Sequence, residues 1–342
     1  MARSGPTSEG SDSTVMVDGR RRAYLDRCQV RRREYFLLER IGGPFRESYL
    51  AFDPLSGPGG DHFVFQSLPA GPATEQRLRV FRRLKDDGFP RAVEWERRKG
   101  RVDLVLTWTA GITLAEYLEH VRAGRRPPVD PGQAVRLIHG LANGVAHLHR
   151  RLQIAHGDIQ PPNVIISSQP SRLRLIDFGS AWTSDWTTLR SEGDGLHRCY
   201  AAPELQNGST PVGFAADQFS VMVLLFELLT LQLPYGGLGG KAGRDDFARR
   251  AAQSLTPPSQ LADTCRQLPR SLRDRLDALV LCGLALAPDQ RYSDPHRWLG
   301  DLHDLSARFR VTPELPPVEN ALTRVIEWFV KPRTTSDKRN PS

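Results

Sequence analysis

The chain has 342 residues, of which 39% are hydrophobic and 25% are charged. These fractions are typical of a globular protein and exclude disorder of the whole chain, while the length suits one large domain or two ordinary ones. Lysine and arginine outnumber acidic residues and give a formal net charge of +8. Such a balance could suit an acidic partner, but a solvated basic surface is the better interpretation. No nucleic-acid-binding motif accompanies the charge, so we expect no nucleic acid partner.

The cysteines indicate a reducing compartment, and the apolar segments indicate neither a signal peptide nor a membrane span. The four cysteines lack the paired spacing of a zinc site or a redox motif. They are Cys28, Cys199, Cys265 and Cys282. The segment 1–18 has no apolar core of the kind found in signal peptides, and the longest apolar run, 219–233, is shorter than the roughly 20 residues of a membrane span. We therefore expect free thiols, no membrane span and a cytoplasmic location.

The first third of the chain has the pattern of an antiparallel sheet that follows an irregular start. Residues 1–32 show little hydrophobic periodicity and are expected to form a disordered leader. Short β-prone runs separated by Gly- and Pro-containing turns come next, at 35–38, 48–51 and 62–65. A helix capped by Thr74 and ending near Leu84 precedes a further strand at 102–108.

The remainder of the chain has mostly helical spacing. Apolar residues recur every three or four positions over 114–121 and 137–148, which predicts two amphipathic helices. After Pro316, apolar residues at 322–329 share one helical face, and we expect this segment to pack back on the domain.

Two short segments carry side chains suited to phosphate chemistry. His156-Gly-Asp-Ile-Gln-Pro-Pro-Asn163 places a carboxylate and an amide five positions apart, and Asp177-Phe-Gly179 follows a predicted strand. Oxygen ligands of this kind are those that magnesium prefers, and a carboxylate can also orient a hydroxyl. His156 itself is expected to be a packed core histidine.

These segments resemble the H-R-D-x-x-x-x-N and D-F-G motifs of the protein kinase family. The resemblance implies that Asp158 accepts the proton of a substrate hydroxyl, with Gln160 beside it in the catalytic loop. It also implies that Asn163 and Asp177 hold Mg²⁺, with ATP as the phosphoryl donor.

Further family features follow in the family's order over about 35–305. Ala202-Pro-Glu204 matches A-P-E, Asp217 heads an apolar helix, and Arg291 lies late in the chain. By the resemblance, Glu204 and Arg291 would form a buried ion pair, and Asp217 would brace the backbone of the catalytic loop. Each feature alone is a weak signal, but together they favour the family.

The resemblance implies an α+β, bilobal protein-kinase-like fold, in which a small antiparallel β lobe with one helix precedes a larger, mainly helical lobe. We expect the kinase-like domain at 33–306 and a tail with a short amphipathic helix at 307–342. Within the domain, the expected parts are a small lobe at 33–106, a hinge at 107–111 and a large lobe at 112–306.

The nucleotide-binding part of the pattern departs from the family. The resemblance implies that the nucleotide meets Ile41, Gly42 and Gly43, but Gln66 replaces the strand lysine that clamps the phosphates. A close pair of unit charges is worth about 4 kcal/mol at an effective dielectric near 20. Each 1.36 kcal/mol changes a rate about tenfold, so uncompensated loss would slow transfer hundreds-fold or more.

Arg46 offers one way to replace the missing cation. It occupies the position of the last loop glycine, and this region loosely resembles the with-no-lysine kinases, in which the same loop supplies the cation. Arg46 either contacts phosphate in this way or faces solvent from a strand, and the sequence leaves both alternatives open.

Other departures concern specificity and regulation. Gln160 replaces the catalytic-loop lysine, His197 stands where serine/threonine kinases usually carry threonine, and Gly157 replaces the arginine that pairs with a phosphorylated loop. The helix glutamate is also absent, with Arg77 at the aligned position and Glu75 nearby.

Three functions remain open at this point. The first is an atypical protein kinase of the serine/threonine type that binds Mg-ATP and acts on a protein substrate. The second is a pseudokinase, a nucleotide-binding scaffold or regulatory module for a protein partner. The third is small-molecule phosphotransfer, because His-Gly-Asp followed by Asn also resembles the loop of aminoglycoside phosphotransferases.

Overall fold

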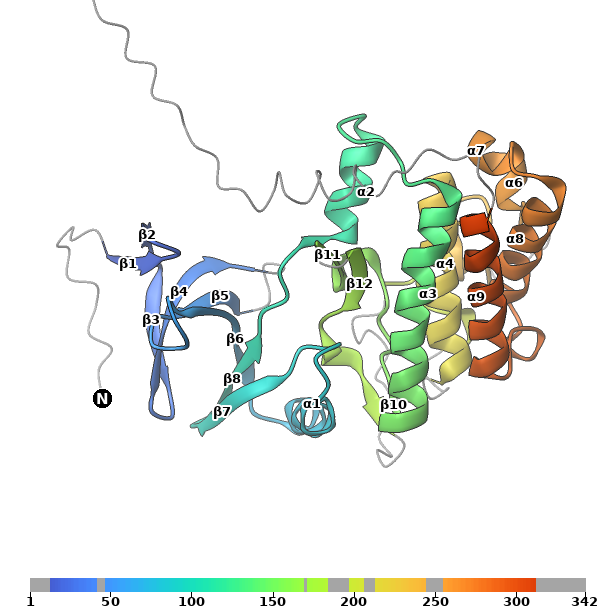
Figure 1. Ribbon diagram of the computed structural model, residues 1–342. Coiled ribbons are helices and arrows are strands. Elements are labelled where there is room, and N and C mark those ends of the chain that lie inside the picture. The colour runs from blue at the N-terminus through green and yellow to red at the C-terminus, as the bar shows by residue number, and fades with distance from the viewer. Residues whose placement is uncertain are drawn as a thin grey trace, which may run out of the picture. The chain divides into compact units, whose positions relative to one another are not determined.

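The computed structural model describes residues 13–41, 47–168, 171–183, 197–205, 213–243 and 255–311 (Figure 1). The chain divides into two compact units, Met1–Trp108 and Thr109–Ser342. The division falls within the segment 107–111 that was expected to be a hinge.

The first unit is built on a six-stranded antiparallel sheet in the order β3-β4-β5-β6-β8-β7 (Figure 1). Its strands are β3 (Asp26–Val30), β4 (Arg33–Arg40), β5 (Ser48–Asp53), β6 (Asp61–Pro69), β7 (Ala92–Arg98) and β8 (Arg101–Thr107). Side chains alternate between the two faces of a strand. One face therefore gathers Tyr35, Leu37, Ala51, Phe63 and Phe65 into a buried core. The predicted strands are confirmed.

The predicted helix of this unit is also confirmed, although its start is three residues earlier than expected. Helix α1 (Pro72–Arg83) begins after Gly71, and Thr74 is not its cap. The Thr74 hydroxyl instead donates to the backbone oxygen of Pro69 at 2.7 Å. Pro72 can occupy the first helical turn because the backbone N–H that proline lacks would have no partner in the helix there.

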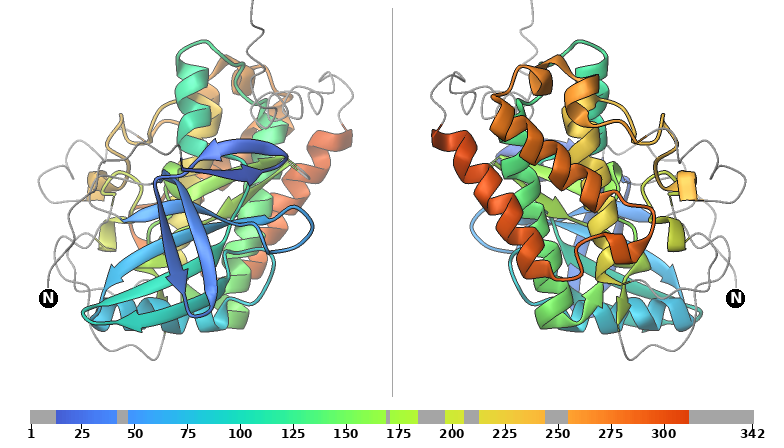
Figure 2. Two further views of the ribbon diagram at one scale, coloured as in Figure 1. Left: turned by 90° about the vertical axis from the view of Figure 1, so that its left-hand side faces the viewer. Right: turned by 90° about the vertical axis from the view of Figure 1, so that its right-hand side faces the viewer.

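The prediction of a disordered leader over 1–32 is wrong for the described residues. Strands β1 (Thr14–Val17) and β2 (Arg20–Ala23) form a hairpin, and β3 extends the main sheet. Val17 packs with Leu38, Leu50 and Phe52 on the second face of the sheet, so the hairpin covers that face (Figure 2). The hairpin turns at Asp18-Gly19, where both φ angles are positive. Asp-Gly is a turn signal in the sequence that hydrophobic periodicity does not detect.

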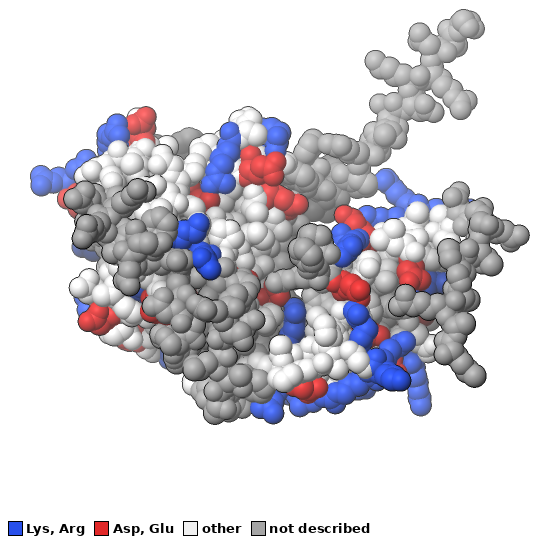
Figure 3. All heavy atoms as spheres, turned by 180° about the vertical axis from the view of Figure 1, so that it is seen from behind, with Lys and Arg blue, Asp and Glu red and all other residues white. Residues whose placement is uncertain are grey.

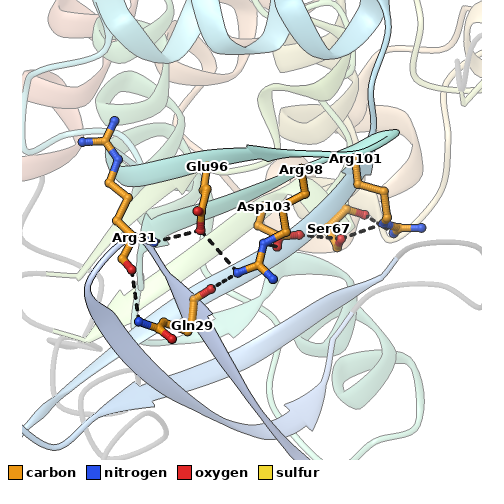
Figure 4. Close-up of polar contacts among 7 residues, drawn as sticks. All are labelled: Gln29, Arg31, Ser67, Glu96, Arg98, Arg101 and Asp103. Carbon is orange, nitrogen blue, oxygen red and sulfur yellow. Dashed lines mark hydrogen bonds and ion pairs between the residues drawn. The ribbon is translucent and has the colours of Figure 1, made fainter. Parts of the chain in front are cut away.

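Polar side chains connect strand β3 to strand β7, which lie at opposite ends of the sheet order (Figure 4). The Arg31 backbone N–H donates to Glu96 Oε2 at 3.0 Å, and Arg31 Nε donates to the backbone oxygen of Trp95 at 3.1 Å. Arg98 Nη2 donates to the backbone oxygen of Gln29. The two edges of the sheet are thereby closed against each other by side chains, which protects their free backbone groups.

The second unit is mainly helical, as predicted. Its helices are α2 (Leu114–Arg122), α3 (Pro131–His147), α4 (Phe214–Thr230), α6 (Pro258–Leu261), α7 (Asp263–Arg266), α8 (Arg270–Gly283) and α9 (Pro295–Val311). Helix α4 is buried on all sides over Ala216–Thr230, and α3 packs against both α4 and α9 (Figure 1). A helix that is apolar all round belongs in a core.

Short strands of the second unit flank the loops that contain the predicted site residues. Strands β9 (Ile112–Thr113), β11 (Val164–Ser168) and β12 (Ser171–Leu175) form one small sheet, with β11 in the middle. Strand β10 (Ile154–Ala155) pairs with β13 (Trp182–Thr183).

The expected C-terminal boundary at 306 is too early, because α9 continues to Val311. The proposed amphipathic helix at 322–329 lies outside the described residues. Within the described ranges, no helix combines the length and apolarity that crossing a membrane requires. All four cysteines are free thiols, as expected.

Charged residues are interspersed on the surface. Figure 3 shows acidic side chains among the more numerous basic ones on one face. In the first unit, Arg97 pairs with Glu75 at 2.7 Å and Arg91 with Asp87 at 3.0 Å. Such exposed pairs contribute little to stability, but they neutralise part of the basic surface.

We predict that Val30→Ala lowers the free energy of unfolding by about 1–3 kcal/mol, because it removes buried methyl groups from the sheet core. Urea unfolding monitored by circular dichroism would measure the change. Leu25→Ala, at a side chain that is 64% exposed, is the matched control and should change stability by less than about 0.5 kcal/mol. Equal stability of the two variants would contradict the assignment of 26–30 to the sheet.

Candidate active site

The loop between β10 and β11 brings three predicted site residues together. Asn163 Nδ2 donates to the backbone oxygen of Asp158 at 2.9 Å and to its Oδ2 at 2.8 Å. Gln160 Nε2 donates to Asp158 Oδ1 at 2.8 Å. Asp158 and Asn163 are each only 7% exposed. The Asp158 carboxylate is therefore fixed by two side-chain amides. These bonds do not involve the side-chain oxygen Oδ1 of Asn163.

Asp217 fixes the backbone at the start of this loop. Its Oδ2 accepts from the His156 N–H at 2.7 Å, and its Oδ1 accepts from the Gly157 N–H at 2.8 Å. His149 Nε2 lies 2.7 Å from Oδ2. The bracing role that the resemblance implied for Asp217 is confirmed. Gly157 has a φ of +72°, which glycine adopts without strain.

The partners of Asp217 decide its charge. Burial acts to raise the pKa of Asp217, but the hydrogen bond and charge of His149, with smaller contributions from His156 and the Gly157 N–H, hold that pKa below its usual value. The carboxylate is 1% exposed, so it stays ionised in the interior only because donors surround it.

The Asp177-Phe-Gly turn is attached to the same loop. The Ile176 N–H donates to the backbone oxygen of Asn163 at 2.9 Å, and His156 Nε2 lies 3.1 Å from the backbone oxygen of Ile176. The buried Phe178 ring packs edge-on against His156, with the centroids 4.8 Å apart. His156 is 0% exposed, so its prediction as a core residue is confirmed.

Asp177 has an unusual backbone conformation, with φ 58° and ψ 80°. Its Oδ1 accepts from the Gly179 N–H at 3.1 Å, a local bond that helps a non-glycine residue to occupy the left-handed region. Strained residues of this kind cluster at functional sites. Carboxylate and amide oxygens are the donors that magnesium prefers, so Asp177 and Asn163 fit the expected metal.

The ion pair predicted between Glu204 and Arg291 is confirmed. Arg291 Nη1 and Nη2 meet the two carboxylate oxygens at 2.8 and 2.9 Å. The Arg291 side chain is 0% exposed, and its guanidinium lies over the Phe219 ring, 4.7 Å from the centroid. A bidentate, buried pair of this kind holds the loop before α4 to the loop before α9.

Gln66 belongs to the first unit. It lies on β6, between β5 and β8, and is 8% exposed. Its Nε2 donates to Ser48 Oγ at 3.2 Å. Glu75 forms a bidentate pair with Arg97 on β7. The position at which the resemblance implied a lysine therefore holds a buried neutral amide, and Glu75 has an arginine partner.

The structure describes only some of the remaining predicted residues. Gly42, Gly43 and Arg46 lie outside the described residues. Ile41 donates its backbone N–H to the backbone oxygen of Ser48 at 2.8 Å. The exposed His197 packs edge-on against Tyr200, with ring centroids 4.9 Å apart.

The sequence did not predict two contacts of the candidate residues, that of His149 with Asp217 and that of Ser48 with Gln66. Neither His149 nor Ser48 lies in a motif, and neither residue type is unusual on a helix or a strand. For His149, the buried acidic residue at position 217 was the available signal, because a buried carboxylate requires donors.

We predict that Asp217→Asn lowers the free energy of unfolding at pH 7 by about 3 kcal/mol, because it breaks a buried pair. The folded pKa lies below the unfolded value of about 3.9, so the stabilisation is present above about pH 4 and is lost as pH falls through the folded pKa. Urea unfolding of both proteins across this range would measure the effect.

Asp263→Asn is the control, since Asp263 is exposed and pairs with Arg266 on its own helix. It should change stability by less than about 0.5 kcal/mol at any pH. An Asp217→Asn protein as stable as the wild type at pH 7 would disprove the bracing role.

Comparison with known proteins agrees with this geometry. The family model described as "Protein kinase domain" matches residues 74–299. CBL-interacting protein kinase 4 of rice is 29% identical over 239 residues, which cover 67% of this chain and 46% of that protein. Serine/threonine-protein kinase PrkC of Bacillus subtilis is 26% identical over 190 residues, covering 55% of this chain and 26% of PrkC.

A probable serine/threonine-protein kinase, PknB of Lactococcus lactis, is 30% identical over 204 residues, covering 58% of this chain and 29% of PknB. The chain thus spans less than half the length of each of these curated relatives. The family match covers well over half of the chain and includes the loop, the Asp-Phe-Gly turn and the Glu204–Arg291 pair. This chain belongs to the protein kinase family.

Proposed function

We propose that this chain is an atypical protein kinase domain that binds Mg-ATP and transfers a phosphoryl group to a serine or threonine hydroxyl of a protein. One observation carries the proposal: Asp158 is hydrogen-bonded to Asn163, whose backbone in turn holds the residue before Asp177. A proton acceptor and two metal-ligand candidates are thereby attached to one rigid loop.

Each residue has a role in the proposed reaction. Asp158 accepts the proton of the substrate hydroxyl as the hydroxyl oxygen bonds to the phosphoryl group and ADP leaves. Gln160 and Asn163 keep that carboxylate in place. Asn163 and Asp177 would hold magnesium, which offsets the charge on the phosphate oxygens of bound ATP.

A second candidate function is a nucleotide-binding pseudokinase. Two positions where the family carries lysine hold neutral amides, and each amide is bonded within the protein, Gln66 to Ser48 and Gln160 to Asp158. Without these cations, transfer is expected to be slow, while binding through hydrogen bonds can persist. This observation favours a scaffold or regulatory module for a protein partner.

A cytoplasmic location is part of the proposal. It is supported by the four free cysteines, which suit a reducing compartment. A protein substrate, rather than a small molecule, is supported by Glu204, Asp217 and Arg291, whose contacts follow the protein kinase pattern.

We predict that Asp158→Asn reduces phosphoryl transfer at least about 100-fold, because it removes the proton acceptor. Transfer from labelled ATP to a generic protein substrate would be measured with magnesium, and nucleotide binding by calorimetry would serve as the folding control. Transfer that survives the substitution at full rate would come from another enzyme and would count against the kinase proposal.

We predict that Gln66→Lys raises phosphoryl transfer by roughly tenfold or more, because it restores a cation beside the phosphates. Gln66→Met, which is similar in size and uncharged, should give no increase. Nucleotide binding without transfer in the wild type and in Gln66→Lys alike would favour the pseudokinase over the kinase.

A further inference from the structure

Helices α8 and α9 lie side by side in the second unit, and a cavity of about 300 Å³ lies between them (Figure 1). The residues that line it recur every three or four positions on each helix, so one face of each helix forms a wall. The volume is at the lower end of the range for ligand pockets, which suits a small molecule. This cavity is separate from the catalytic loop and from the Asp-Phe-Gly turn.

The inner surface of the cavity is largely apolar. Leu279 on α8, Leu305 on α9 and Tyr292 between the two helices line it, and all three are buried. Burial raises the pKa of the Cys282 thiol, which lies beside them. The thiol is therefore protonated at pH 7 and adds a small apolar surface rather than a nucleophile. An apolar group that covers this surface gains free energy by leaving water.

Two opposite charges line the same cavity without forming an ion pair with each other. Arg297 and Asp301 are exposed and one helical turn apart on α9, yet Arg297 has no ion pair within the described residues. The Asp301 carboxylate instead accepts a hydrogen bond from the Tyr292 hydroxyl at 2.8 Å. Arginine before an acidic residue is also the less favourable order for a pair at this spacing. A guanidinium and a carboxylate are thus both available to an occupant of the cavity.

These features match a ligand that carries an anion and a cation close together, beside an apolar group. A guanidinium binds a carboxylate through parallel N–H donors, and a carboxylate accepts hydrogen bonds from an ammonium group. A ligand with a lone negative charge would be repelled by Asp301, and one with a lone positive charge by Arg297. A free α-amino acid with an apolar side chain combines all three groups in a small molecule.

We propose that the cavity between α8 and α9 binds a free α-amino acid with an apolar side chain. The ligand's carboxylate bonds to Arg297, its ammonium group bonds to Asp301, and its side chain covers Leu279 and Leu305. All of these residues belong to the second unit. The site depends neither on nucleotide binding nor on phosphoryl transfer, so it goes beyond the function proposed above.

The test measures the binding of L-phenylalanine to the full chain by NMR titration, beside two ligands that each lack one charge. 3-Phenylpropionate lacks the ammonium group, and phenethylamine lacks the carboxylate. We expect a Kd of about 0.1–1 mM for L-phenylalanine, because so small a ligand makes few contacts. Each of the other ligands should bind at least about fivefold more weakly, because it leaves one charged group of the cavity without a partner.

Substitution of the two charged residues should affect the ligands selectively. Arg297→Gln should weaken the binding of L-phenylalanine and 3-phenylpropionate at least about fivefold and should not weaken that of phenethylamine. Asp301→Asn should weaken L-phenylalanine and phenethylamine to a similar extent and should not weaken 3-phenylpropionate. Asparagine keeps an oxygen that can accept from the Tyr292 hydroxyl, so this variant removes the charge and retains the local bond.

Arg270→Gln and Asp263→Asn are the matched controls for these substitutions. Both residues are exposed, and neither lines the cavity. Each control removes a charge of the same sign as its counterpart from the same part of the second unit. All three ligands should bind both controls within about twofold of their wild-type affinity.

Ala278→Leu gives a second, independent measurement. Ala278 lines the cavity on α8, and leucine at this position fills part of the cavity without changing any charge. Leucine is a good helix former, so the variant should keep the wild-type circular dichroism spectrum. L-Phenylalanine should bind it at least about tenfold more weakly, because the space for its side chain is lost.

The outcomes decide the proposal without reference to the kinase reaction. No binding of L-phenylalanine to wild type well above the expected Kd would overturn it. Binding that Ala278→Leu leaves unchanged would place the ligand elsewhere and would also overturn it. Equal binding of the three ligands to wild type, or equal losses of all three in both charge variants, would rule out recognition of an amino acid. Each of these results leaves the proposed function as it stands.

Discussion

The geometry of the candidate active site depends on one buried carboxylate. Asp217, near the start of the core helix α4, accepts the backbone N–H groups of His156 and Gly157 and lies within hydrogen-bond distance of His149. The desolvation cost of an ion at 1% exposure is offset only while these partners remain in place. The carboxylate therefore fixes the direction of the chain as it enters the loop, and the position of Asp158 follows from that direction.

Two of the departures from the family pattern that the sequence suggests have the same chemistry. Gln66 and Gln160 are neutral amides where the resemblance implies lysine, and each donates its Nε2 to a neighbouring side chain, Ser48 and Asp158 respectively. An amide keeps the hydrogen-bonding capacity of the position and loses its charge. The two substitutions lie in different units, so the change is not confined to one local cluster.

The motif residues were predictable because several short motifs occur together in the order of the protein kinase family, and the pairing of Glu204 with Arg291 was implied by that resemblance. The N-terminal strands were not predictable from periodicity, because β1 and β3 each bury one residue, Val17 and Val30 respectively. The burial of each depends on residues distant in sequence. Ser48 gave no signal at all. A serine on a strand gains meaning only when cross-strand pairing places it opposite a buried amide.

Loss of charge affects the two proposed functions unequally. In phosphoryl transfer, negative charge spreads over the equatorial oxygens in the transition state, and cations near those oxygens lower the barrier. Ground-state binding needs only that the phosphate oxygens and the buried polar groups find partners, which neutral donors can supply. Replacing lysine by an amide is therefore expected to reduce turnover more than affinity. Slow catalysis and nucleotide-dependent scaffolding would then be two degrees of the same physical change. The balance between them would depend on how much phosphate charge a magnesium ion, held by Asn163 and Asp177 as proposed, would offset without lysine.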